Sequence, residues 1–568
     1  MAKANPVREL RDALRACRSY LLWAAGFSLA INLLYLASPL YMLQVYNRVV
    51  NSGSEITLVL LTVILVAAYA ALASLDAIRL QILSRMGVRL DALLGAEVLA
   101  TTFRIGAGGA RSQPLRDFDV FRQFVSSSSI SALLDLPWVP IYIVAAFLLH
   151  PAIGLFTLVS CVVLLILAIS NEFFLSKPLR EANEAAARSH SFAEMSARNA
   201  EVVQAMGMLD GVVRRWGRDR TRFVARQVEA GTRASWMGSL IRFLRLSMQS
   251  LALGLGALLA INHLASTGAM FAGTFLLGRA LQPIEQIVGS WRNIVNARVS
   301  YLRVRDGLSE QGRVPELMKL PRPKGQLTVD SLHFAVQSAT RFALRSVAFA
   351  LAPGEALGIV GPSGAGKSTL TRLIVGVLKP TAGAVRLDDA DIQHWPPMLL
   401  GQHIGYLPQD IELFSDTVAA NISRFTPDAE ADVVKAAQMA GVHEMILRLP
   451  QGYNTQVGEG GAVLSGGYRQ RIGLARAVFR IPSLVVLDEP SSNLDADGDT
   501  ALATCMASLR ALGSTVVIVS HRPATLGAVD KILFLRDGAV EAFGPREQIA
   551  ARLSGKRPTA PEPEMANG

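Results

Sequence analysis

A series of long apolar segments, all before residue 290, constrains this chain more than any other feature. Residues 20–45 and 56–75 contain no charged side chain at all. A helix of about 20 apolar residues crosses the hydrocarbon core of a bilayer. We therefore predict six membrane spans, at about residues 20–45, 56–76, 131–149, 151–171, 243–264 and 266–289.

Composition excludes several other classes of protein. Charged residues make up 18% and hydrophobic residues 51% of the chain, whereas disorder requires low hydrophobicity and high net charge. Three cysteines cannot form a disulfide framework. The alternative of buried helices in a large soluble protein is disfavoured, because core helices rarely extend beyond about 14 residues without a charge.

Basic residues predict the orientation of the spans. Lys and Arg are concentrated before the first span, between spans two and three, and between spans four and five, whereas the other three connections are short and nearly uncharged. Because a Lys/Arg excess marks the cytoplasmic side, we expect both termini and the long loops in the cytoplasm of an inner-membrane protein. This explains much of the net charge of +11 and argues against nucleic-acid binding.

The composition changes after the sixth span. From residue 326 onwards, short β-branched runs alternate with helical stretches, which is typical of an α/β sheet. The predicted fold is thus an all-α, six-helix transmembrane domain followed by an α/β phosphate-loop domain. We expect a cytoplasmic segment at 1–19, the transmembrane domain at 20–310, a linker at 311–325, the nucleotide-binding domain at 326–550 and a disordered tail at 551–568.

A glycine-rich loop in the second half predicts nucleotide binding. It lies between an apolar run at 357–360 and a helical run at 369–378, which is the strand–loop–helix context of a phosphate-binding loop. Lys367 would reach the β- and γ-phosphates, and the Ser368 hydroxyl would bind Mg²⁺. The loop consists of Gly361, Pro362, Ser363, Gly364, Ala365, Gly366, Lys367, Ser368 and Thr369.

Two acids and a second glycine-rich helix start complete the predicted site. Asp488 ends an apolar strand and suits Mg²⁺, and Glu489 suits a base that orients the attacking water. A helix preceded by Ser-Gly-Gly, within Leu464–Arg471, is itself an anion-binding geometry. Since one nucleotide needs only one cradle, we expect a homodimer in which each ATP lies between the loop of one subunit and this helix of the other.

With these motifs in this order, residues from about 324 to 550 resemble an ATP-binding cassette (ABC) nucleotide-binding domain. The resemblance implies ATP and Mg²⁺ as cofactors, and ATP hydrolysis coupled to transport. It implies that Asp488 and Gln409 contact Mg²⁺, that Glu489 is catalytic, and that His521 senses the γ-phosphate. The same resemblance implies that the signature motif consists of Leu464, Ser465, Gly466 and Gly467, and that Asp495 is the D-loop aspartate. It also places Lys367 among the catalytic residues. Tyr468 stands where the family usually has Gln.

The family often stacks adenine on an aromatic residue about 30 positions before the phosphate loop. Val336 occupies that position here, and Phe334 is the nearby candidate.

Segments of the first half resemble bacterial type I protein secretion transporters of the protease and lipase exporter group. The segments that carry this likeness are 38–50, 135–140, 201–209 and 278–283. The likeness implies a secreted protein substrate, a periplasmic membrane-fusion adaptor and an outer-membrane channel as partners. No N-terminal cysteine-peptidase domain is expected. The alternatives are an exporter of lipids or small hydrophobic molecules, and an ATP-gated channel or regulator without productive turnover.

Arg279 is a basic residue well inside the sixth predicted span. Intramembrane charges tend to face a cavity or a partner, so Arg279 is a candidate for the substrate pathway, in contact with an acidic cargo segment. The alternative is that the helix runs long and Arg279 lies near the cytoplasmic surface. Segments 112–124 and 199–209 are candidates for contact with the cassette.

Overall fold

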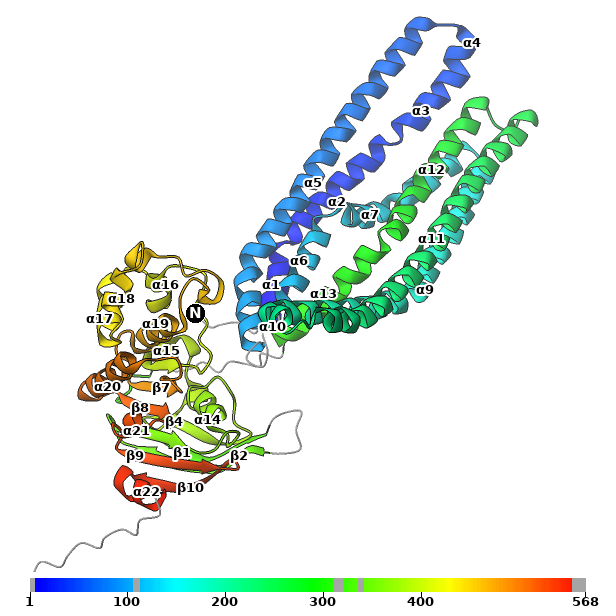
Figure 1. Ribbon diagram of the computed structural model, residues 1–568. Coiled ribbons are helices and arrows are strands. Elements are labelled where there is room, and N and C mark those ends of the chain that lie inside the picture. Colours follow the sequence, from blue (N-terminus) through cyan, green and yellow to red (C-terminus); the bar gives the residue numbers. More distant parts are fainter. Residues whose placement is uncertain (1–5, 106–112, 310–319, 336–341, 554–568) are drawn as a thin grey trace, which may run out of the picture. The chain divides into compact units, whose positions relative to one another are not determined.

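The computed structural model describes residues 6–105, 113–309, 320–335 and 342–553 (Figure 1). It divides into two compact units, Met1–Arg313 and Val314–Gly568. The described residues of the first unit are helical, and the second unit combines helices with β-sheets. The predicted fold class, a helical membrane part followed by an α/β part, is confirmed.

The membrane unit is built from a few very long helices and several short ones. The bounds are α1 Pro6–Ala16, α2 Arg18–Leu34, α3 Ala37–Gln44, the π-helical turn η1 Val45–Val49, α4 Val50–Ser52, α5 Glu55–Ile105, α6 Gln113–Val125, α7 Ser128–Asp135, the 3₁₀ turn η3 Leu136–Trp138, α8 Val139–Leu149, α9 Pro151–Arg198, α10 Ala200–Ala205, α11 Leu209–Ile261, α12 Thr267–Gly289 and α13 Trp291–Ser309.

Among the described residues, five helices are long and apolar enough to cross a membrane. They are Arg18–Ser52, Glu55–Phe103, Ser128–Leu149, Pro151–Ser170 and Leu209–Ile261. The sixth predicted span forms the 23-residue helix α12, which carries Arg279 and Glu285 and is not among these five. The count of six spans therefore stays a prediction.

The helices that contain spans two, four and five, namely α5, α9 and α11, extend far beyond bilayer length, but the third span differs. A new helix, α7, begins just before this span, because Ser127 caps it by accepting a hydrogen bond from the backbone N–H of Ser129 at 3.3 Å. A 3₁₀ turn containing Pro137 then interrupts the span, since proline has no N–H to donate. The connection between spans four and five is likewise divided, at Asn199 and at 206–208.

Two groups of helices make up the membrane unit (Figure 1). Helix α2 packs along α5, whereas α8, α9, α11 and α12 share a hydrophobic core. Two contacts join the groups: α12 packs on α3, which follows α2 in the chain, and α2 packs on α7, which precedes α8. A separate core joins α1, α5, α6 and α13.

The secretion-like segment 38–50 holds the start of α12. The Asn47 side chain accepts a hydrogen bond from the backbone N–H of Gly268 at 2.9 Å and donates one to the Ser266 hydroxyl at 2.8 Å. Tyr46 stacks on Phe271 with ring centroids 4.2 Å apart. The π-helical turn η1 contains both Tyr46 and Asn47, so this local widening of the first span provides the contact surface for α12.

The second unit contains a mostly parallel six-stranded sheet, in the order β10-β9-β3-β8-β7-β6, and a four-stranded antiparallel sheet, in the order β2-β1-β4-β5. The strands are β1 Leu327–Ala335, β2 Phe342–Leu351, β3 Ala356–Val360, β4 Ala382–Leu387, β5 Ala390–Asp391, β6 Ile404–Leu407, β7 Leu484–Asp488, β8 Thr515–Val519, β9 Lys531–Arg536 and β10 Ala539–Pro545. The α/β sheet is confirmed, and the antiparallel sheet was not foreseen.

Nine helices accompany these strands in the described residues. They are α14 Lys367–Ile374, α15 Pro397–His403, α16 Val418–Ile422, α17 Glu430–Met439, α18 His443–Leu447, α19 Gly466–Val478, α20 Ala496–Ala511, α21 Pro523–Leu526 and α22 Arg546–Leu553. Helix α22 covers the first residues of the predicted tail, and 554–568 lie outside the described residues, as does 310–319 in the linker region.

Arg424 joins three of these elements. It follows α16 with a left-handed φ of 54°, and its guanidinium donates to the carbonyls of Arg476 at 2.9 Å, Gly401 at 2.8 Å and Ala477 at 3.0 Å. Burial, with a smaller contribution from Arg476, lowers the pKa of Arg424 to about 10. The side chain thereby links the end of α16 to the end of α19 and to α15.

Replacing Arg424 with methionine should destabilise this unit. The Arg424→Met side chain retains bulk but leaves the three carbonyls without their charged donor, and such hydrogen bonds contribute about 1.5–3 kcal/mol each. We expect the thermal unfolding midpoint of the purified protein to fall by roughly 5 °C or more. Arg448→Met, at an exposed position on the same unit, is the control; equal midpoints for the two variants would contradict the assignment.

Candidate functional site

Four neighbouring parallel strands end at the same edge of the large sheet, and each is followed by a predicted site residue. The phosphate loop follows β3, His521 lies just beyond β8, Asp488 ends β7, and Gln409 lies just beyond β6. The strands are adjacent in the order β3-β8-β7-β6. Ligands of such sheets bind at the carboxyl ends of the strands, so the topology assembles one site from four distant parts of the chain.

The phosphate loop passes directly into a helix N-terminus. Gly366 caps α14 with a φ of 98°, and a Cβ there would come within 2.8 Å of the Leu344 side chain and 2.9 Å of the Ala343 carbonyl oxygen. Only glycine fits this position. The Lys367 side chain is 7% exposed and its ammonium donates to the carbonyls of Gly361 at 2.7 Å and Pro362 at 3.0 Å. A buried cation and a helix N-terminus together form an anion site.

Asp488 has the environment of a metal ligand. It is 1% exposed, and its Oδ2 accepts a hydrogen bond from the Thr371 hydroxyl at 3.2 Å, whereas its Oδ1 has no hydrogen-bond partner among the described residues. Burial raises the pKa of Asp488, and hydrogen bonds from the Ser368 and Thr371 side chains oppose that shift. A buried carboxylate oxygen without a partner, beside a serine hydroxyl, fits the oxygen ligation that Mg²⁺ prefers.

Glu489 meets Gln409 and His521. Its Oε2 accepts a hydrogen bond from the Gln409 amide at 3.2 Å, and its Oε1 lies 4.0 Å from His521 Nε2. Glu489 has a φ of 50°, and its backbone N–H donates to the Val519 carbonyl of β8 at 3.0 Å. The side chain is 30% exposed, so it is accessible to a water molecule and is held between two polar groups. This is the arrangement expected of a group that orients water.

The signature segment starts helix α19. Leu464 is buried as an anchor, and exposed Ser465 is the N-cap, its hydroxyl 3.5 Å from the backbone nitrogen of Tyr468. Gly466 and Gly467 form the first helical residues, and Tyr468 packs against the hydrophobic core. The helix start is therefore capped by Ser465 at the surface, although Tyr replaces the usual Gln.

Sequence reasoning missed the side chains that support these residues. Arg471 forms an ion pair with Asp495 at 2.8 Å, and the Gln470 amide donates to the Pro490 carbonyl at 2.7 Å. Asp495 also caps α20 by accepting from the Gly498 N–H, and this hydrogen bond and Arg471 lower the pKa of Asp495. The polar residues Gln470 and Arg471, which follow the signature glycines, were the sequence signal for these contacts. The ion pair of Arg471 with Asp495 connects the D-loop to the signature helix α19.

The adenine-stacking residue stays a prediction. Val336 lies outside the described residues, and Phe334 is half-buried and packs against the hydrophobic core of the unit.

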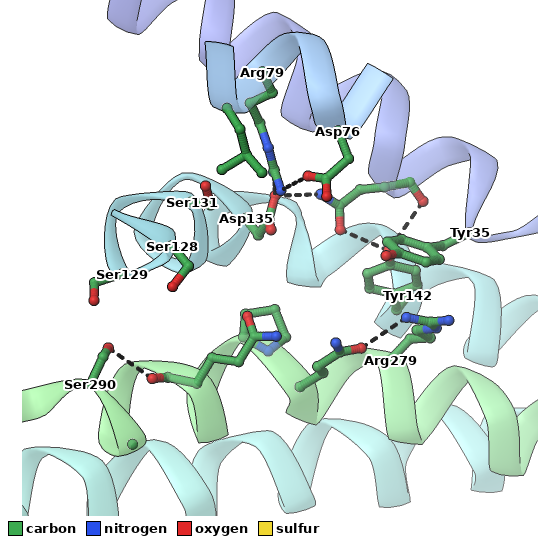
Figure 2. Close-up of a pocket in the computed structure, with 16 residues that line it drawn as sticks. Tyr35, Asp76, Arg79, Ser128, Ser129, Ser131, Asp135, Tyr142, Arg279 and Ser290 are labelled. Carbon is green, nitrogen blue, oxygen red and sulfur yellow. Dashed lines mark hydrogen bonds and ion pairs between the residues drawn. The ribbon is translucent and has the colours of Figure 1, made fainter. Parts of the chain in front are cut away.

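Arg279 lies in the membrane unit and lines a cavity of about 410 Å³ (Figure 2). Its guanidinium carbon is 3.8 Å from the centroid of the Tyr35 ring, and the group donates to Gln282 Oε1 at 2.9 Å. The cavity is lined by residues of α2, α5, α7, α8 and α12 and by Tyr35, which follows α2. Arg279 thus faces a polar space within the helices.

Comparisons with known proteins define the class. Residues 344–492 match the ABC transporter family, and residues 21–283 match the ABC transporter transmembrane region. A bacterial Atm1-family ABC exporter with ATP bound has a similar fold, with a TM-score of 0.83 and 22% identity, covering 96% of this chain and 99% of that one. The chain belongs to the ABC transporters, and it is a multi-pass inner-membrane protein with an ATPase coupled to transport.

Relatives place it more narrowly. The chain is 40% identical to the type I secretion system ATP-binding protein PrsD of Rhizobium meliloti, over 97% of this chain and 95% of the relative. It is 29% identical to the cyclolysin secretion/processing ATP-binding protein CyaB of Bordetella pertussis, over 92% of this chain and 75% of the relative. It is also 29% identical to a toxin RTX-I translocation ATP-binding protein of Actinobacillus pleuropneumoniae, over 93% and 76% respectively.

Removing the carboxylate of Glu489 should stop turnover without preventing nucleotide binding. The Glu489→Gln amide keeps the size and the contact with Gln409 but cannot accept a proton, and loss of a general base lowers rates by at least about a hundredfold. We expect purified Glu489→Gln protein to retain bound ATP and to lose ATPase activity. Glu541→Gln, at a surface ion pair with Arg536, is the control, and undiminished hydrolysis by Glu489→Gln would refute the role.

Proposed function

We propose that this protein exports a protein substrate across the bacterial inner membrane, as the ABC component of a type I secretion system. The observation that carries the proposal is the 40% identity to a type I secretion system ATP-binding protein over nearly the full length of both chains. The other two relatives named above are secretion or translocation proteins as well. This favours a polypeptide over the lipid or small hydrophobic molecule of the rival proposal.

The chemistry that we propose follows from the described site. Lys367 and the loop 361–369 bind the ATP phosphates, and Glu489, held by Gln409, accepts a proton from the attacking water. His521 monitors the γ-phosphate from the neighbouring strand end. Ser368, Gln409 and Asp488 would hold Mg²⁺, which when bound neutralises phosphate charge. The contact between Gln409 and Glu489 argues against the second rival, a channel or regulator without turnover.

The membrane arrangement that we propose has six spans, with α12 as the sixth, in a transmembrane domain at 20–310. The segment 1–19, the nucleotide-binding domain at 326–550 and both termini would be cytoplasmic. Segments 112–124 and 199–209 would transmit ATP-driven closure to the spans. The periplasmic partners would be a membrane-fusion adaptor and an outer-membrane channel.

Export can be tested in the source bacterium by comparing proteins in the culture medium. Deletion of the gene should remove one or more proteins from the medium, and the wild-type gene should restore them. Lys367→Ala should not restore them, because it removes the buried cation of the phosphate loop. An unchanged set of secreted proteins, or loss of a lipid alone, would contradict protein export.

We further propose that the working unit is a homodimer in which each ATP lies between the phosphate loop of one subunit and the signature helix of the other. Exposed Ser465 supports this arrangement, because it places the N-terminus of helix α19 at the surface of the unit. A tandem dimer of two fused copies, with Glu489→Gln in both, allows the number of retained ATP molecules to be counted.

Two disruptive changes, Lys367→Met and Ser465→Arg, distinguish shared from separate sites. Placed in different copies, they fall in the same shared site, so one ATP per tandem dimer should be retained. Placed in the same copy, they disrupt both shared sites, so none should be retained. The opposite pattern would mean that each site is formed within a single subunit.

A further inference from the structure

The cavity beside Arg279 is lined by a group of three charged side chains on one side and by the single charge of Arg279 on the other (Figure 2). Arg79, Asp76 and Asp135 meet on one side, and Arg279 lies beside Tyr35 and Tyr142 on the other. In a medium of low dielectric constant, an unpaired ionised side chain raises the free energy of the folded protein, and where one is present it usually has a function. The partners of each charge therefore indicate its role.

The charges of the first group pair with one another. The Arg79 side chain is 7% exposed and forms ion pairs with Asp135 at 2.7 Å and with Asp76 at 2.6 Å. Asp135 also accepts hydrogen bonds from Asn32, at 3.0 Å, and from Ser28. These contacts join α2, α5 and α7, so this group holds the wall of the cavity together.

Arg279 has no such carboxylate partner. Within the described residues it forms no ion pair, and the groups that it contacts are the Tyr35 and Phe275 rings and the Gln282 amide, which are all neutral. Glu285, the carboxylate on the same helix, is already paired with Arg245 at 2.8 Å. A guanidinium has five N–H donors in a planar fork that suits a carboxylate. Several of these donors are available to a ligand in the cavity.

The remainder of the lining offers uncharged hydrogen-bonding groups. Ser128, Ser129 and Ser131 of α7 line the cavity opposite Ser290, the residue that follows α12 (Figure 2). Ser131 is 6% exposed, and its hydroxyl oxygen is buried without a hydrogen-bond partner in the described part of the chain. A buried hydroxyl without a partner is costly, and a peptide N–H or carbonyl would satisfy it.

We propose that this cavity binds an extended polypeptide segment through a carboxylate, which pairs with Arg279 while the serine hydroxyls bind the peptide backbone. The inference rests on the proposed export of protein and names the chemistry by which the cargo is recognised. The carboxylate comes from an Asp or Glu side chain or from the chain terminus, and the two sources can be distinguished with synthetic peptides.

The test uses the full-length protein in nanodiscs of zwitterionic phosphatidylcholine, with Gly289→Cys as the reporter. Position 289 lines the cavity, and a Cβ there meets nothing within 4 Å. The native cysteines, Cys17, Cys161 and Cys505, are buried and should react slowly. The rate of maleimide labelling is measured with three nonapeptides: a central Asp with an amidated terminus, a central Asn with a free terminus, and a central Asn with an amidated terminus.

We expect labelling to be slowed by a peptide that carries a carboxylate and not by the amidated Asn peptide. Protection by the amidated Asp peptide assigns a side chain, and protection by the Asn peptide with a free terminus assigns the chain end. Arg279→Gln should raise the half-protecting concentration at least about tenfold, the equivalent of one charged hydrogen bond. Equal protection by all three peptides, or none, would overturn the proposal, as would protection by anionic lipid in place of peptide.

A second variant separates recognition from a structural role. Gln282 Oε1 is the present hydrogen-bond acceptor of Arg279, so Gln282→Glu keeps Arg279 but gives it a carboxylate partner within the protein. Because that carboxylate competes with the peptide, the variant should weaken peptide protection as much as Arg279→Gln does. Arg242→Gln, an exposed position on α11, removes an equal charge outside the cavity lining and should leave protection unchanged. Normal protection in Gln282→Glu would count against the ion pair.

ATPase activity in the same nanodiscs keeps the two proposals distinguishable. ATP hydrolysis that persists in Arg279→Gln with lost protection supports the cavity assignment. Hydrolysis and protein export that persist with no peptide protection in any variant overturn the cavity assignment alone. An unchanged set of secreted proteins in the deletion test, by contrast, would be a failure of the proposed function.

Discussion

The nucleotide chemistry of this protein depends on the parallel alignment of strands β3, β8, β7 and β6. Their residues are almost all buried, and the pairing of β7 with β8 places Asp488 opposite Val519. Because parallel strands in register end together, loops that are far apart in the chain converge at one edge. The hydrogen bond from the Glu489 N–H to Val519 then fixes the direction in which the carboxylate leaves the sheet. Catalytic geometry is thus a consequence of sheet register.

The membrane unit is governed by a different constraint, which is the cost of charge in a medium of low dielectric constant. Arg79 forms ion pairs with two carboxylates, and Arg245 forms one with Glu285, which offsets this cost. Arg279 instead lies over the Tyr35 ring and beside an amide, which stabilises the cation without neutralising it. The same residue type therefore serves as a structural link in one place and remains open to a ligand in another.

The predictable part of the site was local in the chain. The phosphate loop, the acids after β7 and the signature helix start are runs of consecutive residues, each with its own physical mechanism, and the β-branched runs predicted β3, β6, β7 and β8. The missed features join distant residues: Asn47 accepts a hydrogen bond from Gly268 of α12, 221 positions away in the chain, and Arg471 pairs with Asp495, 24 positions away. The break in the third span was also missed, because its cause is a serine cap and a proline turn inside an apolar run.

By itself, the sequence determined that the first half is helical and apolar enough to cross a membrane and that the second half binds phosphate on a glycine-rich loop. Those properties follow from hydrophobic length and from the backbone freedom of glycine, both of which are local. Only the tertiary structure decided that Arg79 is paired with Asp76 and Asp135, while Arg279 lines the same cavity without an ion pair among the described residues. Charge pairing depends on the distances between helices, and those distances are set by packing.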